Sequence, residues 1–94
     1  MDTLNDYMRT TMTDKLPISL TIDGTDYHLM ERCTSEHDKH FPNWWSFEYR
    51  RYDGKSLPPK VHSKTEWYYL CSIAPTKEQA YNQLLDKVNN MVDE

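Results

Sequence analysis

The sequence predicts a two-layer α+β domain, in which an antiparallel sheet of about four strands packs against a C-terminal amphipathic helix. Three observations predict this fold class. Apolar and polar residues alternate in residues 16–22 and again in residues 45–49, which is the period of a half-buried strand. An Asp-Gly pair, typical of a β-hairpin, follows each of these segments at 23–24 and 53–54. The last part of the chain carries an apolar stripe at helical spacing.

The first half of the chain is predicted to form a short helix and the first hairpin. Thr3 stands at an N-cap position with Asp6 three residues later, and this helix is expected to end near Asp14, with one apolar face made by Leu4, Met8 and Met12. The first strand is expected over Leu16–Ile22. The return strand, from Thr25 to about Arg32, would carry Tyr27 and Leu29 on one face and His28 and Met30 on the other.

The second half is predicted to continue the sheet and then to end in the helix. Residues 34–43 form a polar loop, and Trp44 opens a strand that turns Trp45, Phe47 and Tyr49 toward the core. A second hairpin is expected at Asp53-Gly54, but Pro58-Pro59 limits residues 55–64 to a short edge piece and a loop. The last strand, residues 65–73, is expected to turn one set inward, namely Trp67, Tyr69, Cys71 and Ile73, and the other set outward, namely Glu66, Tyr68, Leu70 and Ser72.

The C-terminal helix has its own start signal. Thr76 and Gln79 form a capping box, and the apolar stripe that follows consists of Ala80, Tyr81, Leu84, Leu85, Val88, Met91 and Val92. The order of elements is similar to that of double-stranded-RNA-binding domains. Those domains carry a lysine cluster at the start of the last helix, where this chain has Lys77 alone, so the similarity concerns topology and transfers no residue.

Composition excludes several classes of protein. The 94 residues fit a single domain spanning residues 1–94, and no apolar run approaches the roughly 20 residues of a membrane helix. The N-terminus has neither the basic start nor the apolar block of a secretory signal. Only two glycines are present, which excludes a glycine-rich phosphate loop. We therefore expect a cytoplasmic chain with two free thiols, with one intrachain disulfide as the alternative.

One segment contains residue types that bind metals or act in catalysis. Cys33, His37 and His40 lie close together in the sequence, but their spacing matches no common zinc pattern, and a fourth ligand would have to come from a distant strand. Cys33, His37 and Asp38 also supply a nucleophile, a base and an orienting acid, with nothing to place them in that geometry. The alternative is a polar loop whose histidines titrate near neutral pH. We expect no enzyme activity, no cofactor and no metal site.

Charge is segregated along the chain. Residues 43–65 carry five basic and two acidic side chains, whereas the whole chain has a net charge of −4. Arg50 and Arg51 lie beside Trp44 and Tyr52, a combination of cations and rings that suits a nucleic-acid face. The alternative is that these cations neutralise acidic neighbours.

Aromatic residues point to a protein-binding surface. Trp44, Tyr52, Tyr68 and Leu70 fall on the face opposite the predicted core and would form an exposed patch, unless the N-terminal helix, the 55–64 loop or a second copy covers them. We predict a non-enzymatic module that binds another protein, with nucleic acid as the alternative partner. Its general character is similar to that of small accessory proteins of phages and mobile elements, some of which cap a host enzyme. The predicted contact residues are Trp44, Arg50, Arg51, Tyr52, Lys55, Lys60 and Tyr68.

Overall fold

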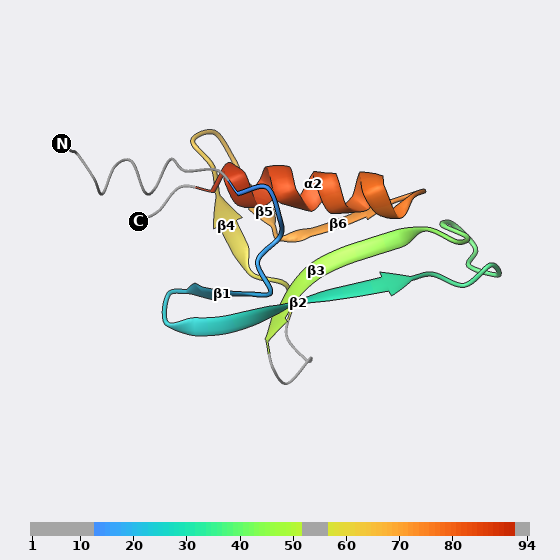
Figure 1. Ribbon diagram of the computed structural model, residues 1–94, viewed down its shortest axis with the longest axis horizontal. Helices are drawn as coiled ribbons and strands as arrows, with labels where there is room; N and C mark the ends of the chain where they lie inside the picture. The colour runs from blue at the N-terminus through green and yellow to red at the C-terminus, as the bar shows by residue number, and fades with distance from the viewer. Residues whose placement is uncertain (1–12, 52–56, 92–94) are drawn as a thin grey trace.

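The computed structural model describes residues 13–51 and 57–91, which contain six strands and one helix (Figure 1). The elements are β1 (Ser19–Ile22), β2 (Thr25–Cys33), β3 (Trp45–Arg51), β4 (Lys60–His62), β5 (Trp67–Tyr69), β6 (Cys71–Ala74) and α2 (Lys77–Asn89). The predicted N-terminal helix falls almost entirely on residues 1–12, outside the described residues.

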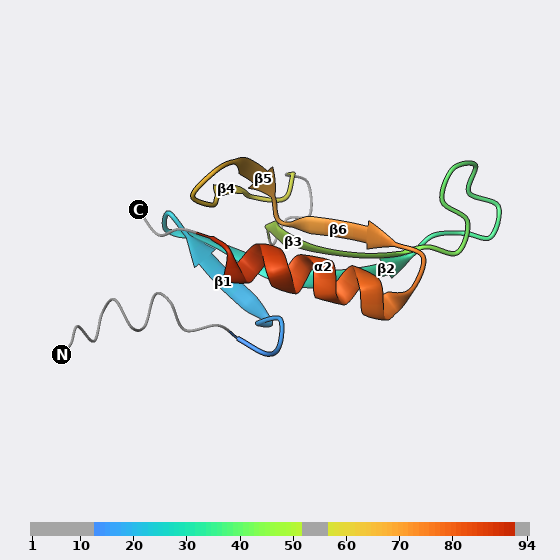
Figure 2. The same ribbon diagram turned by 90° about the horizontal axis from the view of Figure 1, so that it is seen from above.

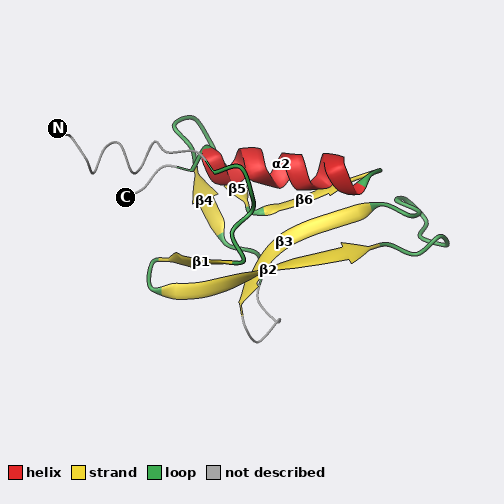
Figure 3. Ribbon diagram, in the orientation of Figure 1, coloured by secondary structure: helices red, strands yellow, loops and turns green. Residues whose placement is uncertain are grey.

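The predicted α+β class is confirmed. The main sheet is antiparallel with the strand order β1-β2-β3-β6, and α2 lies along one of its faces (Figures 2 and 3). β1 and β2 join through Asp23 and Gly24, whose φ angles of 51° and 78° are the left-handed values that a tight hairpin turn requires. Within the described residues, no helix combines the length and the apolarity needed to span a bilayer.

The pairing of β3 differs from the expected second hairpin. β3 is bonded to β2 and β6, while β4 pairs with β5 in a separate two-stranded sheet. Leu70, between β5 and β6, accepts a bond from the Tyr49 backbone N–H at 3.1 Å and donates one to the Pro59 carbonyl at 3.0 Å. β3 and β4 therefore follow one another along the same edge of the β5–β6 segment, residues 67–74, instead of pairing with each other.

The predicted orientation of the β5–β6 segment was wrong. Leu70, Ser72 and Ala74 are buried, with at most 7% of their surface exposed, whereas Trp67 and Ile73 are exposed. Small side chains explain this choice, because α2 lies so close to β6 that the Ser72 hydroxyl donates to the Ala80 carbonyl at 2.7 Å. A large ring on that side of the strand would hold the helix away from the sheet.

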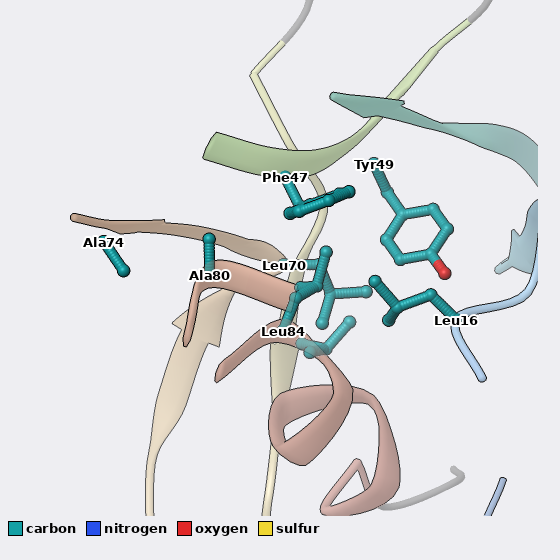
Figure 4. Close-up of a cluster of buried hydrophobic side chains, with 8 residues drawn as sticks. Leu16, Phe47, Tyr49, Leu70, Ala74, Ala80 and Leu84 are labelled. Atoms are coloured by element: carbon teal, nitrogen blue, oxygen red, sulfur yellow. The ribbon is translucent and has the colours of Figure 1, made fainter. Parts of the chain in front are cut away.

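The core lies between the sheet and α2 (Figure 4). Phe47 and Tyr49 of β3 are buried as predicted and meet Leu70 and Leu84 there, and Leu16 closes the cluster. The Tyr49 hydroxyl donates to the Pro17 carbonyl at 2.7 Å, which satisfies the one polar atom of this ring. Burying each large side chain of this kind stabilises the fold by roughly 1.5–3 kcal/mol.

The capping of α2 agrees with the sequence. The Gln79 backbone N–H donates to the Thr76 hydroxyl at 3.1 Å, and Ala80 and Leu84 of the apolar stripe are fully buried. The first turn is tied to the sheet by Lys77, whose Nζ lies 3.1 Å from a Glu31 carboxylate oxygen and 5.4 Å from the centre of the Trp45 ring.

Candidate functional site

The side of the sheets turned away from α2 is a surface that no described helix covers. Cross-strand partners share a face, so three rows of this side follow from the register: His28–Arg50, Met30–Glu48–Cys71 and Arg32–Ser46–Ile73. Trp67 and Tyr69 belong to the same side, because their neighbours in β5 and β6 turn toward α2. The pairing of β1 with β2 adds Ser19, Thr21 and Asp26 to this side. We call this surface the open face: Ser19, Thr21, Asp26, His28, Met30, Arg32, Ser46, Glu48, Arg50, Lys60, His62, Trp67, Tyr69, Cys71 and Ile73.

Exposed apolar side chains gather on the open face. Trp67 is 61% exposed, and Met30, Tyr69 and Ile73 are between 38% and 43% exposed. The other large hydrophobic residues that are exposed in the described part of the chain, Ile18, Phe41 and Leu57, lie outside the strands. The strands therefore present their exposed apolar surface on one side, which in a monomer commonly marks a contact site.

The charged groups of the open face are mostly basic. Arg32, Arg50 and Lys60 are accompanied by two acids, Asp26 near the turn of the first hairpin and Glu48, which lies 3.3 Å from an Arg50 guanidinium nitrogen. Both members of this ion pair are at least three-quarters buried. Burial also raises the pKa of the neighbouring Cys71 thiol, and Glu48 adds to this effect, while Lys87 acts in the opposite direction. The Cys71 thiol is thus held in its neutral form and contributes apolar surface.

The two-stranded sheet of β4 and β5 holds two rings beside two basic side chains. Lys60 pairs with Tyr69 across the strands, and its Nζ lies 5.9 Å from the centre of the Tyr69 ring. His62 pairs with Trp67, with 4.6 Å between ring centres. On the opposite side of this small sheet Val61 is buried in the core. This contact fixes the position of the two strands that carry the exposed rings.

Tyr68 provides the second anchor of this small sheet. Its hydroxyl donates to the Lys87 carbonyl near the end of α2 at 2.7 Å. Burial of the ring raises the pKa of the hydroxyl, and the nearby Glu66 carboxylate raises it further. The prediction that Tyr68 faces away from the core was wrong, because its ring packs against the core cluster on the side of α2.

A second candidate surface is the loop 34–44, which extends beyond the ends of β2 and β3 (Figures 1 and 2). The Asp38 carboxylate accepts bonds from the backbone N–H groups of His40 at 3.0 Å and Phe41 at 2.8 Å. These bonds, with that of Phe41 first in importance, lower the pKa of the Asp38 carboxyl. The Thr34 hydroxyl bonds to the Phe41 carbonyl and accepts from the Trp44 N–H, so the loop is fixed by its own side chains.

The structure separates the residues that were predicted to form one contact site. Trp44 packs against Phe41 in the 34–44 loop, with 4.9 Å between ring centres, and is half-buried. Arg50 and Lys60 lie on the open face, whereas Arg51 is exposed on the other side of β3. Tyr52 and Lys55 lie outside the described residues. Leu70, which was expected in the exposed patch, is fully buried.

The thiol and imidazoles near the loop do not converge. Cys33 is a free and exposed cysteine, and His37 makes its contact with Glu36, at 3.4 Å between Nε2 and Oε2. Within residues 13–51 and 57–91, no three His, Cys, Asp or Glu side chains lie close enough together to hold a metal ion.

Sequence reasoning missed the apolar part of the open face. It assigned Trp67, Tyr69 and Ile73 to the core, because the larger side chains of an alternating strand are usually the buried ones. The signal that could have corrected this is the small residues Ser72 and Ala74, which directly precede a helix that must lie close to the sheet.

In comparisons with known proteins, no family model, no curated protein and no solved structure matches this chain.

Proposed function

We propose that this chain is a non-enzymatic protein-binding module that contacts its partner through the open face. The observation that carries the proposal is the exposure of Trp67, Tyr69, Met30 and Ile73 on one side of the sheets, next to Arg50 and Arg32. Trp, Tyr and Arg are the residues on which protein interfaces depend most for affinity, and Met is enriched in such interfaces.

The partner surface that suits this face is apolar at its centre and acidic at its rim. Ser46 lies between Arg32 and Ile73 in one row, and Met30 lies in the next row opposite Glu48. Arg32 and Lys60 are exposed nearby and would meet acidic groups of the partner. Charge complementarity of this kind mainly increases the rate of association.

The proposed action is to cap a cellular macromolecule in the cytoplasm, as small phage and mobile-element inhibitors do. A capping protein needs a complementary surface and no catalytic group, and the open face meets this requirement. The two free cysteines support a reducing compartment.

The test compares Trp67→Ala with a matched control, Ile18→Ala. Ile18 is 83% exposed and lies outside the open face, so both variants remove an exposed apolar side chain without disturbing the core. Each protein is immobilised, nuclease-treated lysate is applied, and proteins bound by the wild type are purified and titrated directly. We expect Ile18→Ala to bind like the wild type and Trp67→Ala to bind about 30-fold more weakly, the loss typical of a hot-spot residue of about 2 kcal/mol. Equal affinity of all three proteins would contradict the proposal.

A second candidate function is the binding of single-stranded nucleic acid, and the arrangement of β4 and β5 favours it. Trp67 and Tyr69 are two residues apart on one strand, so their Cα atoms are about 6.6 Å apart, with Lys60 opposite Tyr69 and His62 opposite Trp67. Exposed rings flanked by cations stack bases and follow the phosphate backbone.

A labelled oligothymidylate tests this second candidate. Binding by stacking would quench tryptophan fluorescence in the wild type but not in Trp67→Ala, and the logarithm of the affinity would fall linearly with the logarithm of the salt concentration. Tyr69→Ala would weaken binding by about 1–3 kcal/mol. Absence of binding at low salt would exclude this function.

A further inference from the structure

The β5–β6 segment, residues 67–74, has one edge that no described strand covers. Both bonds of Leu70, to Tyr49 and to Pro59, lie on the side of β3 and β4. Main-chain groups of alternate residues in a strand point to opposite edges, so those of Trp67, Tyr69, Cys71 and Ile73 point away from β3 and β4. The Cys71 carbonyl confirms this direction, because it accepts a bond from Lys87 Nζ at 2.6 Å instead of from β3.

The strand residues along this edge are apolar, and Lys87 of α2 places one charged side chain on it, at the Cys71 carbonyl. The four residues whose main-chain groups point outward also carry the side chains that turn to the open face, and three of them are exposed: Trp67, Tyr69 and Ile73. An edge with apolar side chains, no charge in its own strands and no paired strand is a template for pairing with another strand. Monomeric proteins commonly protect such an edge with lysine, proline or a bulge, and among residues 67–74 neither lysine nor proline occurs.

We propose that two copies of this chain pair through their β5–β6 segments, antiparallel and about a two-fold axis beside Leu70. In this register Trp67 lies opposite Ile73 of the second copy, and Tyr69 lies opposite its Cys71. Pairs of an aromatic with a β-branched or other apolar side chain stabilise antiparallel strands. The outward main-chain groups of all four residues find partners, because a carbonyl has two lone pairs and the Cys71 oxygen can accept a second bond beside that from Lys87.

The charge pattern favours a second copy at this edge over the other long strand. β2 also has a free edge beyond β1, since Thr34 N–H donates to the Trp44 carbonyl and the main-chain groups of Glu31 and Cys33 therefore point away from β3. A two-fold pairing of Glu31 with Cys33 there would place Arg32 opposite Arg32, and like charges directly opposite destabilise a strand pair. The β5–β6 edge has no such conflict.

The paired molecule has a defined arrangement. Because the two-fold axis is perpendicular to the sheet, both copies of α2 lie on one side and both open faces lie on the other. The contact surface of the proposed function is thereby doubled and becomes continuous across the axis.

Sedimentation equilibrium of the full chain, from low micromolar concentration upward, tests the pairing. We expect a reversible dimer in the wild type and in the control Ile18→Lys. In Ile73→Lys the new charge would face Trp67 of the second copy, and we expect dimerisation at least tenfold weaker. A wild type that stays monomeric at every concentration overturns the proposal, and so does a dimer that Ile73→Lys leaves unchanged.

A cross-linking experiment tests the register itself. Tyr69 and Cys71 of the second copy would have Cα atoms about 5.5 Å apart, within the range of a disulfide. In a Cys33→Ser background, Tyr69→Cys should therefore form a covalent dimer on mild oxidation, while Ile18→Cys should not. Equal cross-linking of the two variants would overturn the register.

Discussion

Ser72 determines how closely α2 approaches the sheet. Its hydroxyl fills the space between β6 and the first turns of the helix and donates to the Ala80 carbonyl, and Ala80 itself is fully buried. The contact decides which side of the β5–β6 segment faces the core, and thus places Trp67 and Tyr69 on the open face.

Two substitutions at Ser72 separate the hydrogen bond from the size of the side chain. Ser72→Ala removes the bond and is expected to lower the free energy of unfolding by about 1 kcal/mol. Ser72→Leu adds a larger side chain where the helix leaves no space, and is expected to cost roughly 1–3 kcal/mol beyond the loss of the bond. Urea unfolding measures both values.

Ser46 supplies the control for this pair, because it lies on the neighbouring strand but belongs to the open face. Ser46→Ala and Ser46→Leu should each change stability by less than the corresponding change at Ser72. If Ser46→Leu lowered the free energy of unfolding as much as Ser72→Leu, Ser46 would be as tightly packed as Ser72, and the open face would not be an exposed surface.

At the scale of single residues, the sequence predicts burial well in a strand that has apolar residues on only one of its two faces. Phe47 and Tyr49 alternate with Ser46, Glu48 and Arg50, and they are buried as expected. The β5–β6 segment carries apolar residues on both sides, so alternation alone could not choose between them. The close packing of α2 on β6 decides which side is buried, and this packing is a property of the tertiary structure.

The helix α2 begins at a side chain that satisfies its first turn. The Thr76 hydroxyl accepts from the Gln79 N–H, and Glu78 adds an acidic side chain in the first turn. Both features stabilise the N-terminal end of a helix.

Thr76→Ala should therefore lower the free energy of unfolding by about 1 kcal/mol. Gln83→Ala provides the control, because Gln83 is exposed in the middle of the same helix and alanine is a strong helix former. Chemical denaturation followed by circular dichroism compares the two variants. A loss in Gln83→Ala equal to that in Thr76→Ala would show that the cap contributes nothing.

Elements defined by local signals were predictable, and elements defined by distant partners were not. The capping box of α2 and the turn at Asp23-Gly24 involve residues within a few positions of each other. The pairing of β3 with β6 joins Tyr49 to Leu70, and no local pattern encodes which of two later strands β3 will meet. The Asp53-Gly54 pair, which lies outside the described residues, predicted a hairpin because sequential strands usually pair.

For the whole molecule, two tyrosine hydroxyls and the Cys71 thiol contribute to the response to alkali, because burial raises the pKa of each. Burial raises the pKa of Tyr49 well above its ordinary value, and burial also raises that of Tyr68. In the unfolded chain both hydroxyls ionise near pH 10. The stabilisation from keeping them neutral is fully present below about pH 10 and is lost as the pH rises toward the folded values.

Urea unfolding at increasing pH should therefore show stability that is level up to about pH 8, begins to fall as the Cys71 thiol of the unfolded chain ionises, and falls more steeply above about pH 10. Tyr49→Phe loses the hydrogen bond to the Pro17 carbonyl and should be less stable at neutral pH, but its decline in alkali should be shallower than that of the wild type. An equally steep decline in the variant would assign the alkaline response to other groups.

The open face, which we propose as the contact surface, was only partly predictable from the sequence. The basic residues Arg50 and Lys60 were identified from the segregation of charge, and both lie on the open face. The rings beside them come from β5, which the same reading had placed in the core. A site assembled from β2, β3, β4, β5 and β6 depends on the order of the strands, and the chain fixes that order only when it folds.

Thr13 and Asn89 are joined by two hydrogen bonds, from the Thr13 N–H to the Asn89 side-chain oxygen at 2.9 Å and from the Asn89 amide nitrogen to the Thr13 carbonyl at 3.1 Å. The described chain thus starts and finishes at one corner, far from the 34–44 loop (Figure 1). The two ends of the described chain therefore lie close together, and proteins with this arrangement tolerate circular permutation. A chain joined at this corner and opened within the 34–44 loop would keep every strand pairing of the main sheet while exchanging which end of the molecule carries the termini.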